Sequence, residues 1–250
     1  MRDESVFKPQ GGGGSEGGRL GGLFKTYRMK VYFISGLAAD SRIFKNIRLP
    51  DGWEIEHLDW IPPLDDEPLE AYALRLAERI DRSQPFALLG MSMGGMIAAI
   101  LARHFAPVLT VIISSVPAPR FLPPYFRWGK KLGLHKIVPM RMIKSLSLIK
   151  RLFSAETNED KMILRQVIKD SDPRFIRWAM GAILSWDTED LPASYIQLHG
   201  SRDEVLPARY VKPDYLIKGA GHIMILNRAT EINAILERIF NGVNLSPEKQ

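Results

Sequence analysis

The sequence predicts an α/β fold, in which a mostly parallel sheet lies between layers of helices. Short apolar segments alternate with segments of helical periodicity from Met29 onward. A G-x-S-x-G motif at residues 90–94 joins one apolar segment to a helical one. The alternation stops at residues 119–190, where the pattern predicts several helices in succession. We therefore expect a parallel sheet with one helical insertion.

The predicted elements follow in order along the chain. Residues 31–35 form a short apolar strand, and residues 69–82 carry apolar side chains at helical spacing. Residues 108–114 are rich in β-branched residues, which is typical of a buried strand. The other predicted elements are strands at 53–60, 86–89, 195–198 and 215–217, helices at 93–105 and 229–240, and a short helix at 206–211.

The length of 250 residues suits a single domain with an insertion. Eight of the twelve residues at 11–22 are glycine, and such a segment buries too little apolar surface to offset its ordering entropy. We expect a disordered tail at 1–28, a core formed by 29–118 and 191–242, a helical cap at 119–190, and a C-terminal tail at 243–250.

A strand-to-helix turn surrounds Ser92, in the segment FALL-GMSMGG-MIAAILARHF. A serine on such a turn projects its hydroxyl above the sheet edge, and the glycines two residues away on each side permit close packing. The G-x-S-x-G pattern alone is common by chance. The strand before it and the helix after it therefore carry the prediction that Ser92 is a nucleophile.

His222 is the predicted base for Ser92. It follows the strand at 215–217 within the sequence GAGH and precedes the last helix, so it is expected at the edge of the sheet where the strands end. The pattern places the other histidines differently: His57 in a strand, His104 on the helix after Ser92, His135 in the insertion, and His199 at a strand end as a packing or hydrogen-bonding residue.

Asp203 is the predicted acid, in the loop HGSRDEVLP after the strand at 195–198. Its carboxylate would hold the imidazole in the required tautomer and stabilise the imidazolium. Glu204 is the nearest alternative and stays open at this point. The stretch SSVP after the strand at 108–114 offers no carboxylate.

Two backbone N–H groups are predicted to bind the oxyanion of an acyl-transfer reaction. One belongs to Met93, directly after the nucleophile. The other is assigned to Leu37, in the loop SGLAAD after the first strand, because Gly36 frees the backbone to turn that amide inward.

Together, the turn at Ser92, SGLAAD, HGSRDEVLP and GAGH resemble the α/β-hydrolase superfamily over about residues 29–241. Within it, the chain looks most like small, capped, cofactor-free carboxylesterases, among them esterases that cleave pimeloyl-carrier-protein methyl ester. The resemblance implies an α/β-hydrolase fold with a helical cap after the strand that follows the nucleophile helix, and no cofactor.

Three features depart from that family pattern. Ser35-Gly36 stands where His-Gly is usual, and there is no room after Met29 for the two antiparallel strands that often begin the fold. Only 18 residues separate Asp203 from His222, so any helix between them must be short.

The insertion at 119–190 is predicted to shape the substrate pocket. Among its aromatic residues, Phe126, Trp128 and Trp178 are the expected substrate contacts. Residues 120–151 hold nine Lys or Arg and no Asp or Glu. Three interpretations of this basic segment stay open: a solvated cationic face, a docking surface for an acidic carrier protein, and adsorption to an anionic lipid surface. Nucleic acid is not expected, because no recognition motif accompanies the charge.

The chemistry predicted from these residues is cleavage of a carboxylic ester or thioester through an acyl-enzyme on Ser92. Two alternatives stay open: a lyase or C–C bond hydrolase with the same triad, and a small-molecule sensor built on this fold. The chain has no cysteine, which excludes disulfides, thiol nucleophiles and thiolate metal sites and agrees with a cytoplasmic location. No metal site is predicted, and no apolar run approaches the roughly 18 residues of a membrane span.

Overall fold

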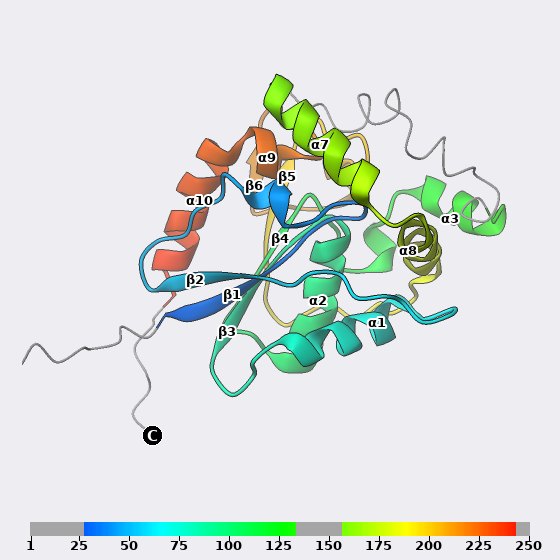
Figure 1. The fold of residues 1–250 in the computed structure, drawn as a ribbon, viewed down its shortest axis with the longest axis horizontal. Coiled ribbons are helices and arrows are strands. Elements are labelled where there is room, and N and C mark those ends of the chain that lie inside the picture. Colours follow the sequence, from blue (N-terminus) through cyan, green and yellow to red (C-terminus); the bar gives the residue numbers. More distant parts are fainter. Residues whose placement is uncertain (1–27, 134–156, 244–250) are drawn as a thin grey trace, which may run out of the picture.

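The computed structural model describes residues 28–133 and 157–243. Almost all of the predicted tails at 1–28 and 243–250 lies outside the described residues, as do His135 and most of the basic segment. In the described part, strands and helices alternate as the sequence predicted, apart from the helices inserted between 119 and 185 (Figure 1).

Six strands form one sheet in the order β2-β1-β3-β4-β5-β6, and every neighbouring pair is parallel. This confirms the predicted fold class. The sequence leaves no room after Met29 for the two antiparallel strands that often begin this fold. In agreement, all strand pairs in the described part are parallel. The strands are β1 (Met29–Ile34), β2 (Trp53–His57), β3 (Phe86–Met91), β4 (Leu109–Ile113), β5 (Ile196–Gly200) and β6 (Tyr215–Ile217).

Both faces of the sheet are buried, because successive side chains of a strand point to opposite faces. In β1, Val31 and Phe33 belong to one core and Tyr32 and Ile34 to the other. We call the first the α10-side core, since α10 (Ala229–Asn241) packs on it, and the second the α2-side core, which is covered by α1 (Leu69–Leu76) and α2 (Met93–Phe105).

The outer strand β2 pairs with β1 on one side only in the described part of the chain. Its glutamates Glu54 and Glu56 are exposed, and Glu56 forms an ion pair of 2.9 Å with Lys30 of β1. At the other edge, β6 is only three residues long.

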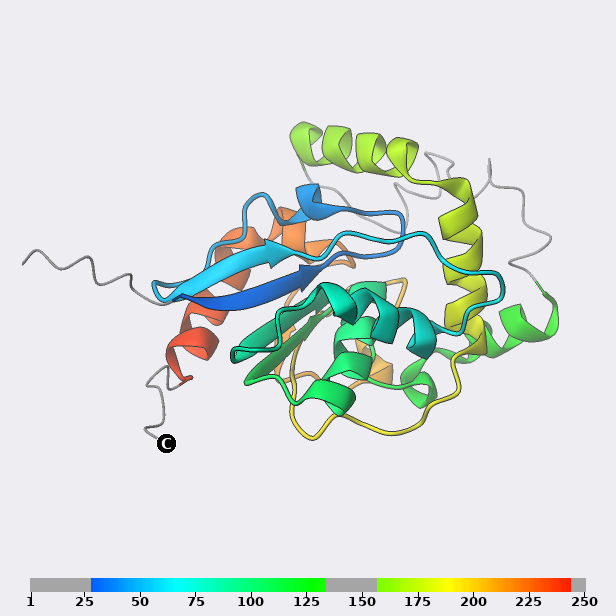
Figure 2. The same cartoon turned by 60° about the horizontal axis from the view of Figure 1, so that its bottom comes forward.

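Four described helices follow β4 and precede β5: a 3₁₀ turn (Pro119–Phe121), α3 (Pro124–Lys131), α7 (Asn158–Asp170) and α8 (Pro173–Ser185). α7 packs on the α10-side core and α8 on the α2-side core, so the turn between them crosses from one face of the sheet to the other. In Figure 2, α8 and α3 lie beyond the ends to which the β1 and β2 arrows point. We refer to that end as the carboxyl edge of the sheet.

Several element boundaries differ from the prediction for local reasons. The predicted helix at 69–82 ends at Leu76 and tightens into a 3₁₀ turn, Ala77–Arg79, and the Tyr32 hydroxyl then accepts the N–H of Asp81 at 2.9 Å. The strand was predicted to reach residue 60 but ends at His57. The pair of Phe33 and His57 is the last one between β1 and β2. The short helix predicted at 206–211 is a single 3₁₀ turn, Ala208–Tyr210, and α9 (Met224–Asn227) was not predicted.

Candidate active site

Ser92 lies between β3 and α2 in a backbone conformation that few residues other than glycine adopt. Its φ is 55° and its ψ is −120°. The turn is held from below by β4 and the segment after it: the Ser92 N–H donates to the carbonyl of Ile113 at 2.9 Å, and the Ser115 hydroxyl donates to the carbonyl of Ser92 at 2.6 Å. This conformation lifts the Ser92 side chain out of the sheet at its carboxyl edge.

Two glycines make the sharp turn possible by the absence of a side chain. A Cβ atom on Gly90 would lie 2.2 Å from the carbonyl oxygen of Gly94. A Cβ atom on Gly94 would lie 2.2 Å from the carbonyl oxygens of both Ile34 and Ser35. The G-x-S-x-G spacing therefore has a steric cause, since α2 lies too close to β3 at Gly90, and to the end of β1 at Gly94, for any side chain.

The structure brings Ser92, His222 and Asp203 together from three separate loops. Oγ of Ser92 is 2.9 Å from Nε2 of His222, and Nδ1 of His222 is 2.8 Å from Oδ2 of Asp203. A carboxylate only accepts hydrogen bonds, so the imidazole carries its hydrogen on Nδ1 and presents Nε2 as an acceptor to the Ser92 hydroxyl. His222 and Asp203 are buried, whereas Ser92 is partly exposed.

The carboxylate of Asp203 is held in its ionised form. Burial alone would raise its pKa, but electrostatic attraction to the His222 ring and hydrogen bonds from His199, His222 and Leu206 outweigh burial and hold the pKa well below the usual value. Its second oxygen, Oδ1, accepts the N–H groups of Val205 at 2.9 Å and Leu206 at 2.8 Å. Glu204, the alternative acid, is exposed to solvent.

The loop that carries Asp203 is also tied to helix α3. The hydroxyl of Tyr125 donates to the carbonyl of Val205 at 2.6 Å. Burial, together with the nearby Asp203 carboxylate, raises the pKa of Tyr125 to about 12, so the hydroxyl keeps its proton at neutral pH. One of the inserted helices thus contacts the acid loop directly.

The loop after β1 turns back at residues 36–39, close to the elbow. The N–H of Ala39 donates to the carbonyl of Gly36 at 3.1 Å, and Leu37 occupies the first central position of this turn. The left-handed residue of the turn is Ala38, with φ of 57°. A Cβ atom on Gly36 would lie 3.2 Å from Sδ of Met91 and 3.3 Å from Cβ of Ser92. The role of the Leu37 amide stays a prediction. The other predicted donor, Met93, is the first residue of α2, where backbone N–H groups are free of helical partners.

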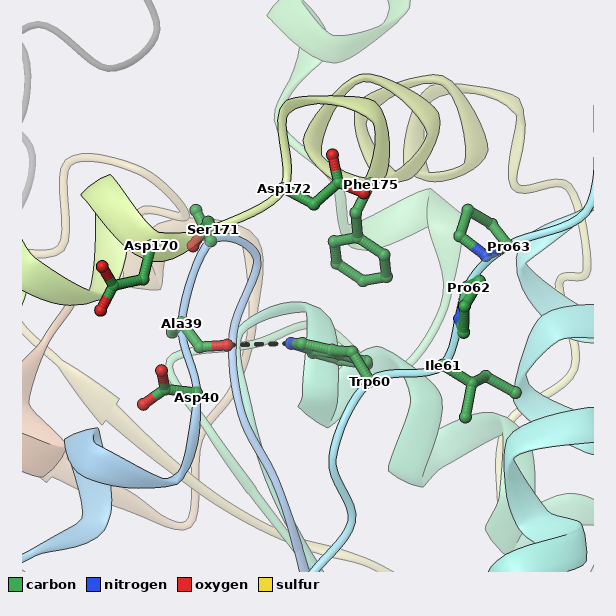
Figure 3. Close-up of a pocket in the computed structure, with 11 residues that line it drawn as sticks. Ala39, Asp40, Trp60, Ile61, Pro62, Pro63, Asp170, Ser171, Asp172 and Phe175 are labelled. Carbon is green, nitrogen blue, oxygen red and sulfur yellow. Dashed lines mark hydrogen bonds between the residues drawn. The ribbon is translucent and has the colours of Figure 1, made fainter.

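A cavity of about 340 Å³ adjoins this loop (Figure 3). Its walls are residues 38–40, residues 60–63, the α7–α8 turn at 170–172, and Phe175. Most of this lining is apolar, and a volume of this size is typical of small-molecule pockets. The sequence analysis missed this cavity, because its walls come from three segments that are distant along the chain.

Carboxylates stand at the rim of this cavity, and an arginine neutralises two of them. Nη2 of Arg42 lies 2.6 Å from Oδ2 of Asp40 and 2.9 Å from Oδ2 of Asp170. Burial alone would raise the pKa of Asp40, but the Arg42 guanidinium outweighs it and holds this pKa below its usual value. Asp172 caps α8 by accepting the N–H of Arg174 at 2.8 Å.

The three predicted substrate contacts have different surroundings. Trp128 is 67% exposed on α3. Phe126 is partly buried and packs on the α2-side core. Trp178 lies against Tyr72, with ring centroids 4.3 Å apart, and donates its N–H to the carbonyl of Glu67 at 2.9 Å. Their predicted role in substrate binding stays a prediction.

The remaining described histidines lie apart from Ser92. His57 is exposed beside Phe44, and His104 contacts Glu70 at 2.8 Å. His199 is buried next to Asp203, where Nε2 faces the carbonyl of Leu206 at 2.6 Å. Among the residues that the structure describes, no three His, Asp or Glu side chains gather as a metal site would require.

Comparison with known proteins agrees with this arrangement. The model of the alpha/beta hydrolase family matches residues 31–235, which is most of the chain. The chain belongs to the alpha/beta hydrolase family. It is accordingly a hydrolase, and the resemblance noted in its motifs is confirmed.

Curated relatives within the alpha/beta hydrolases include two pimeloyl-[acyl-carrier protein] methyl ester esterases of Neisseria meningitidis. The protein of serogroup A is 26% identical over 86% of this chain and 77% of its own length. The protein of serogroup C is 26% identical over 86% of this chain and 94% of its own length. A thermophilic esterase from Thermogutta terrifontis has the same fold, with a TM-score of 0.67, 19% identity, and coverage of 87% of this chain and 91% of that chain.

No helix within residues 28–133 and 157–243 combines the length and the apolar character that crossing a bilayer would require.

Proposed function

We propose that this alpha/beta hydrolase is a serine esterase that cleaves a carboxylic ester or thioester through an acyl-enzyme on Ser92. The observation that carries the proposal is the pair of hydrogen-bond distances that link Ser92, His222 and Asp203: 2.9 Å from Oγ to Nε2 and 2.8 Å from Nδ1 to Oδ2. Such a chain of contacts lets an imidazole remove the serine proton as the hydroxyl attacks a carbonyl carbon.

In the first half of the reaction, Oγ of Ser92 attacks the carbonyl carbon while Nε2 of His222 takes its proton. The C=O bond becomes a C–O⁻ single bond, and the leaving alcohol or thiol then departs with the proton from Nε2. Asp203, which is buried and ionised, stabilises the imidazolium that exists between these steps. The products are an acyl group on Ser92 and the free alcohol or thiol.

In the second half, water replaces the alcohol. His222 removes a proton from water, the hydroxide adds to the acyl carbon, and the carboxylic acid leaves as Oγ regains its proton. In both halves we assign the oxyanion to the N–H groups of Leu37 and Met93. The position of Met93 at the start of α2 supports this assignment, because the helix N-terminus favours negative charge.

The names of the curated relatives suggest a carrier-bound acyl ester as the substrate class. An acyl carrier protein is acidic, and the basic segment at 120–151 would suit it by charge. We further propose that residues 119–190 act as a cap over the site, with Phe126, Trp128 and Trp178 near the acyl group, and that the protein works in the cytoplasm without a cofactor. The contact of Tyr125 with the acid loop supports a cap that reaches the active site.

The test is labelling with a fluorophosphonate, followed by turnover of p-nitrophenyl esters from C2 to C12. Ser92→Ala should abolish labelling and lower kcat on the order of 10⁶-fold. Ser83→Ala is the matched control, because Ser83 is an exposed serine before β3 and should leave both unchanged. Labelling at a serine other than Ser92 would refute the proposal. Labelled protein with no ester turnover would favour a sensor or a C–C bond hydrolase.

A further inference from the structure

The carbonyl of Ala39 accepts two side-chain hydrogen bonds that have no role in the mechanism above. The hydroxyl of Ser35 donates to it at 2.9 Å, and the indole N–H of Trp60 donates to it at 2.9 Å (Figure 3). Ser35 is the residue that stands where the family usually has histidine, and Trp60 lies 21 positions after Ala39 along the chain. Two elements of the fold therefore converge on one peptide group of the loop after β1.

Ala39, the residue that bears this carbonyl, also closes the turn that presents the Leu37 amide, through its own N–H. Ala38, in the middle of the turn, has φ of 57°, a conformation that stores strain in a residue with a Cβ atom. Among the described residues, a single backbone bond crosses the turn, from the Ala39 N–H to the Gly36 carbonyl at 3.1 Å. A strained turn closed by one backbone bond is more stable in a fixed shape when other groups hold it, and the carbonyl of Ala39 accepts two such contacts.

Trp60 is itself fixed by its neighbours, so its N–H is aimed rather than free to rotate. Its ring lies 5.2 Å from that of Phe175 and 6.3 Å from that of Tyr72. The hydroxyl of Tyr72 accepts the N–H of Ile61 at 3.0 Å and donates to the carbonyl of Ile61 at 2.9 Å, which fixes the backbone next to Trp60. Packing and backbone contacts thus set the direction of the indole N–H before any substrate arrives.

We propose that Trp60 is a positioning residue that, together with Ser35, holds the Ala39 carbonyl and so keeps the Leu37 N–H directed at the oxyanion. This inference rests on the proposed function. Because the two donors share one acceptor, either alone can hold the turn, and removal of both releases it. The Trp60 ring also lines the cavity of Figure 3, so this positioning contact lies at a pocket wall.

The experiment uses the full chain with Trp60→Phe, which keeps an aromatic ring but removes the N–H, Ser35→Ala, and the double variant. Each single change should lower kcat about 2- to 4-fold with KM within about twofold, the lower end of the effect of one lost hydrogen bond, because the other donor still holds the turn. The double variant should lose about 100-fold or more, beyond the product of the two, because an oxyanion donor is then misplaced. Trp53→Phe is the control: Trp53 is buried against Phe240 at the first residue of β2, the strand end opposite the carboxyl edge, so the change should lower the melting temperature and leave kcat unchanged.

A second measurement separates positioning from general loosening of the fold. n-Butylboronic acid forms a bond from boron to Oγ of Ser92, and the resulting tetrahedral adduct places an oxygen at the oxyanion position. Its inhibition constant should rise by the same factor as kcat/KM falls across the three variants. A folded double variant with kcat and inhibition constant within threefold of the parent would overturn the inference. Ser92→Ala, assayed beside them, tests the proposed function separately: if it stays active, the proposed function fails, whatever the Trp60 variants do.

Discussion

His199 lies 3.3 Å from Oδ2 of Asp203, the same oxygen that His222 contacts at 2.8 Å. Nε2 of His199 also faces the carbonyl of Leu206, and a carbonyl only accepts, so this nitrogen carries its hydrogen and donates. The Asp203 carboxylate is therefore surrounded by donors: the imidazoles of His222 and His199 at Oδ2, and two backbone N–H groups at Oδ1. Every one of these contacts favours the carboxylate over the carboxylic acid.

Asp203→Asn should lower kcat by about 10⁴-fold while the protein stays folded, because the amide holds the imidazole in the wrong tautomer. Glu204→Gln is the matched control. Glu204 is the next residue and is exposed, so its change should leave kcat within about twofold. Steady-state assays on one p-nitrophenyl ester compare them. Greater damage from Glu204→Gln would move the role of acid to that residue.

Stability should depend on pH through Asp203. Its pKa in the folded protein is lower than in the unfolded chain, so the ionised carboxylate stabilises the fold at neutral pH. That stabilisation is complete above the unfolded pKa of about 4 and is lost as the pH falls through the folded value. Urea unfolding at several pH values gives the free energy of unfolding of the parent and of Asp203→Asn. The difference between the two free energies should be constant above pH 5 and should become smaller below about pH 4. A difference that stays constant down to pH 3 would contradict this.

Gly94→Ala should destabilise the fold by about 3 kcal/mol or prevent folding, because the new methyl group would lie 2.2 Å from two carbonyl oxygens of the β1 end. Gly242→Ala offers a comparison at the end of α10, where a Cβ would come no closer than 3.3 Å to its neighbours and φ is −75°. That change should shift the free energy of unfolding by less than about 1 kcal/mol. If Gly94→Ala and Gly242→Ala lowered the free energy of unfolding equally, β1 and α2 would be able to move apart, and the steric explanation would be wrong.

Reversal of Lys130, Lys131, Lys136 and Lys144 to Glu tests whether the basic segment binds an acidic carrier. Turnover of p-nitrophenyl acetate should stay unchanged, since a small neutral ester needs no contact with these charges. The kcat/KM for an acyl-carrier-protein ester should fall, and the loss should shrink as salt screens the charges over about 8–10 Å. The same four lysines changed to Gln should give an intermediate loss. Equal effects on both substrates would instead assign the charges to the folding of residues 119–190.

Much of the fold could be predicted because the sequence pattern is local. Residues 93–102 are small or apolar without a break and lead into Arg103, His104 and Phe105, and α2 has the predicted bounds, 93–105. The strand at 215–217 was also predicted with its observed limits. The order of Ser92, Asp203 and His222 along strand ends was enough to expect them at one edge of the sheet, and the structure brings them within hydrogen-bond distance.

What the sequence did not predict depends on contacts between distant segments. Residues 58–60 continue an apolar pattern and were predicted as strand, yet Trp60 leaves the sheet and bonds to Ala39. Its packing partner Phe175 is more than a hundred positions away. The left-handed conformation at Ala38 was not predicted either, because alanine rarely adopts it. These features follow from tertiary packing and leave no periodic signal.

The exposed glutamates of β2 have a consequence for how copies of this protein behave at high concentration. An outer strand offers unpaired backbone groups to any other strand, and two molecules could join their sheets through it. In such a pairing Glu54 and Glu56 of one copy would meet the same residues of the next, and the repulsion of like charges opposes it. These two side chains therefore favour the dispersed protein over sheet-to-sheet assembly, and replacing both by threonine would remove that protection without touching Ser92.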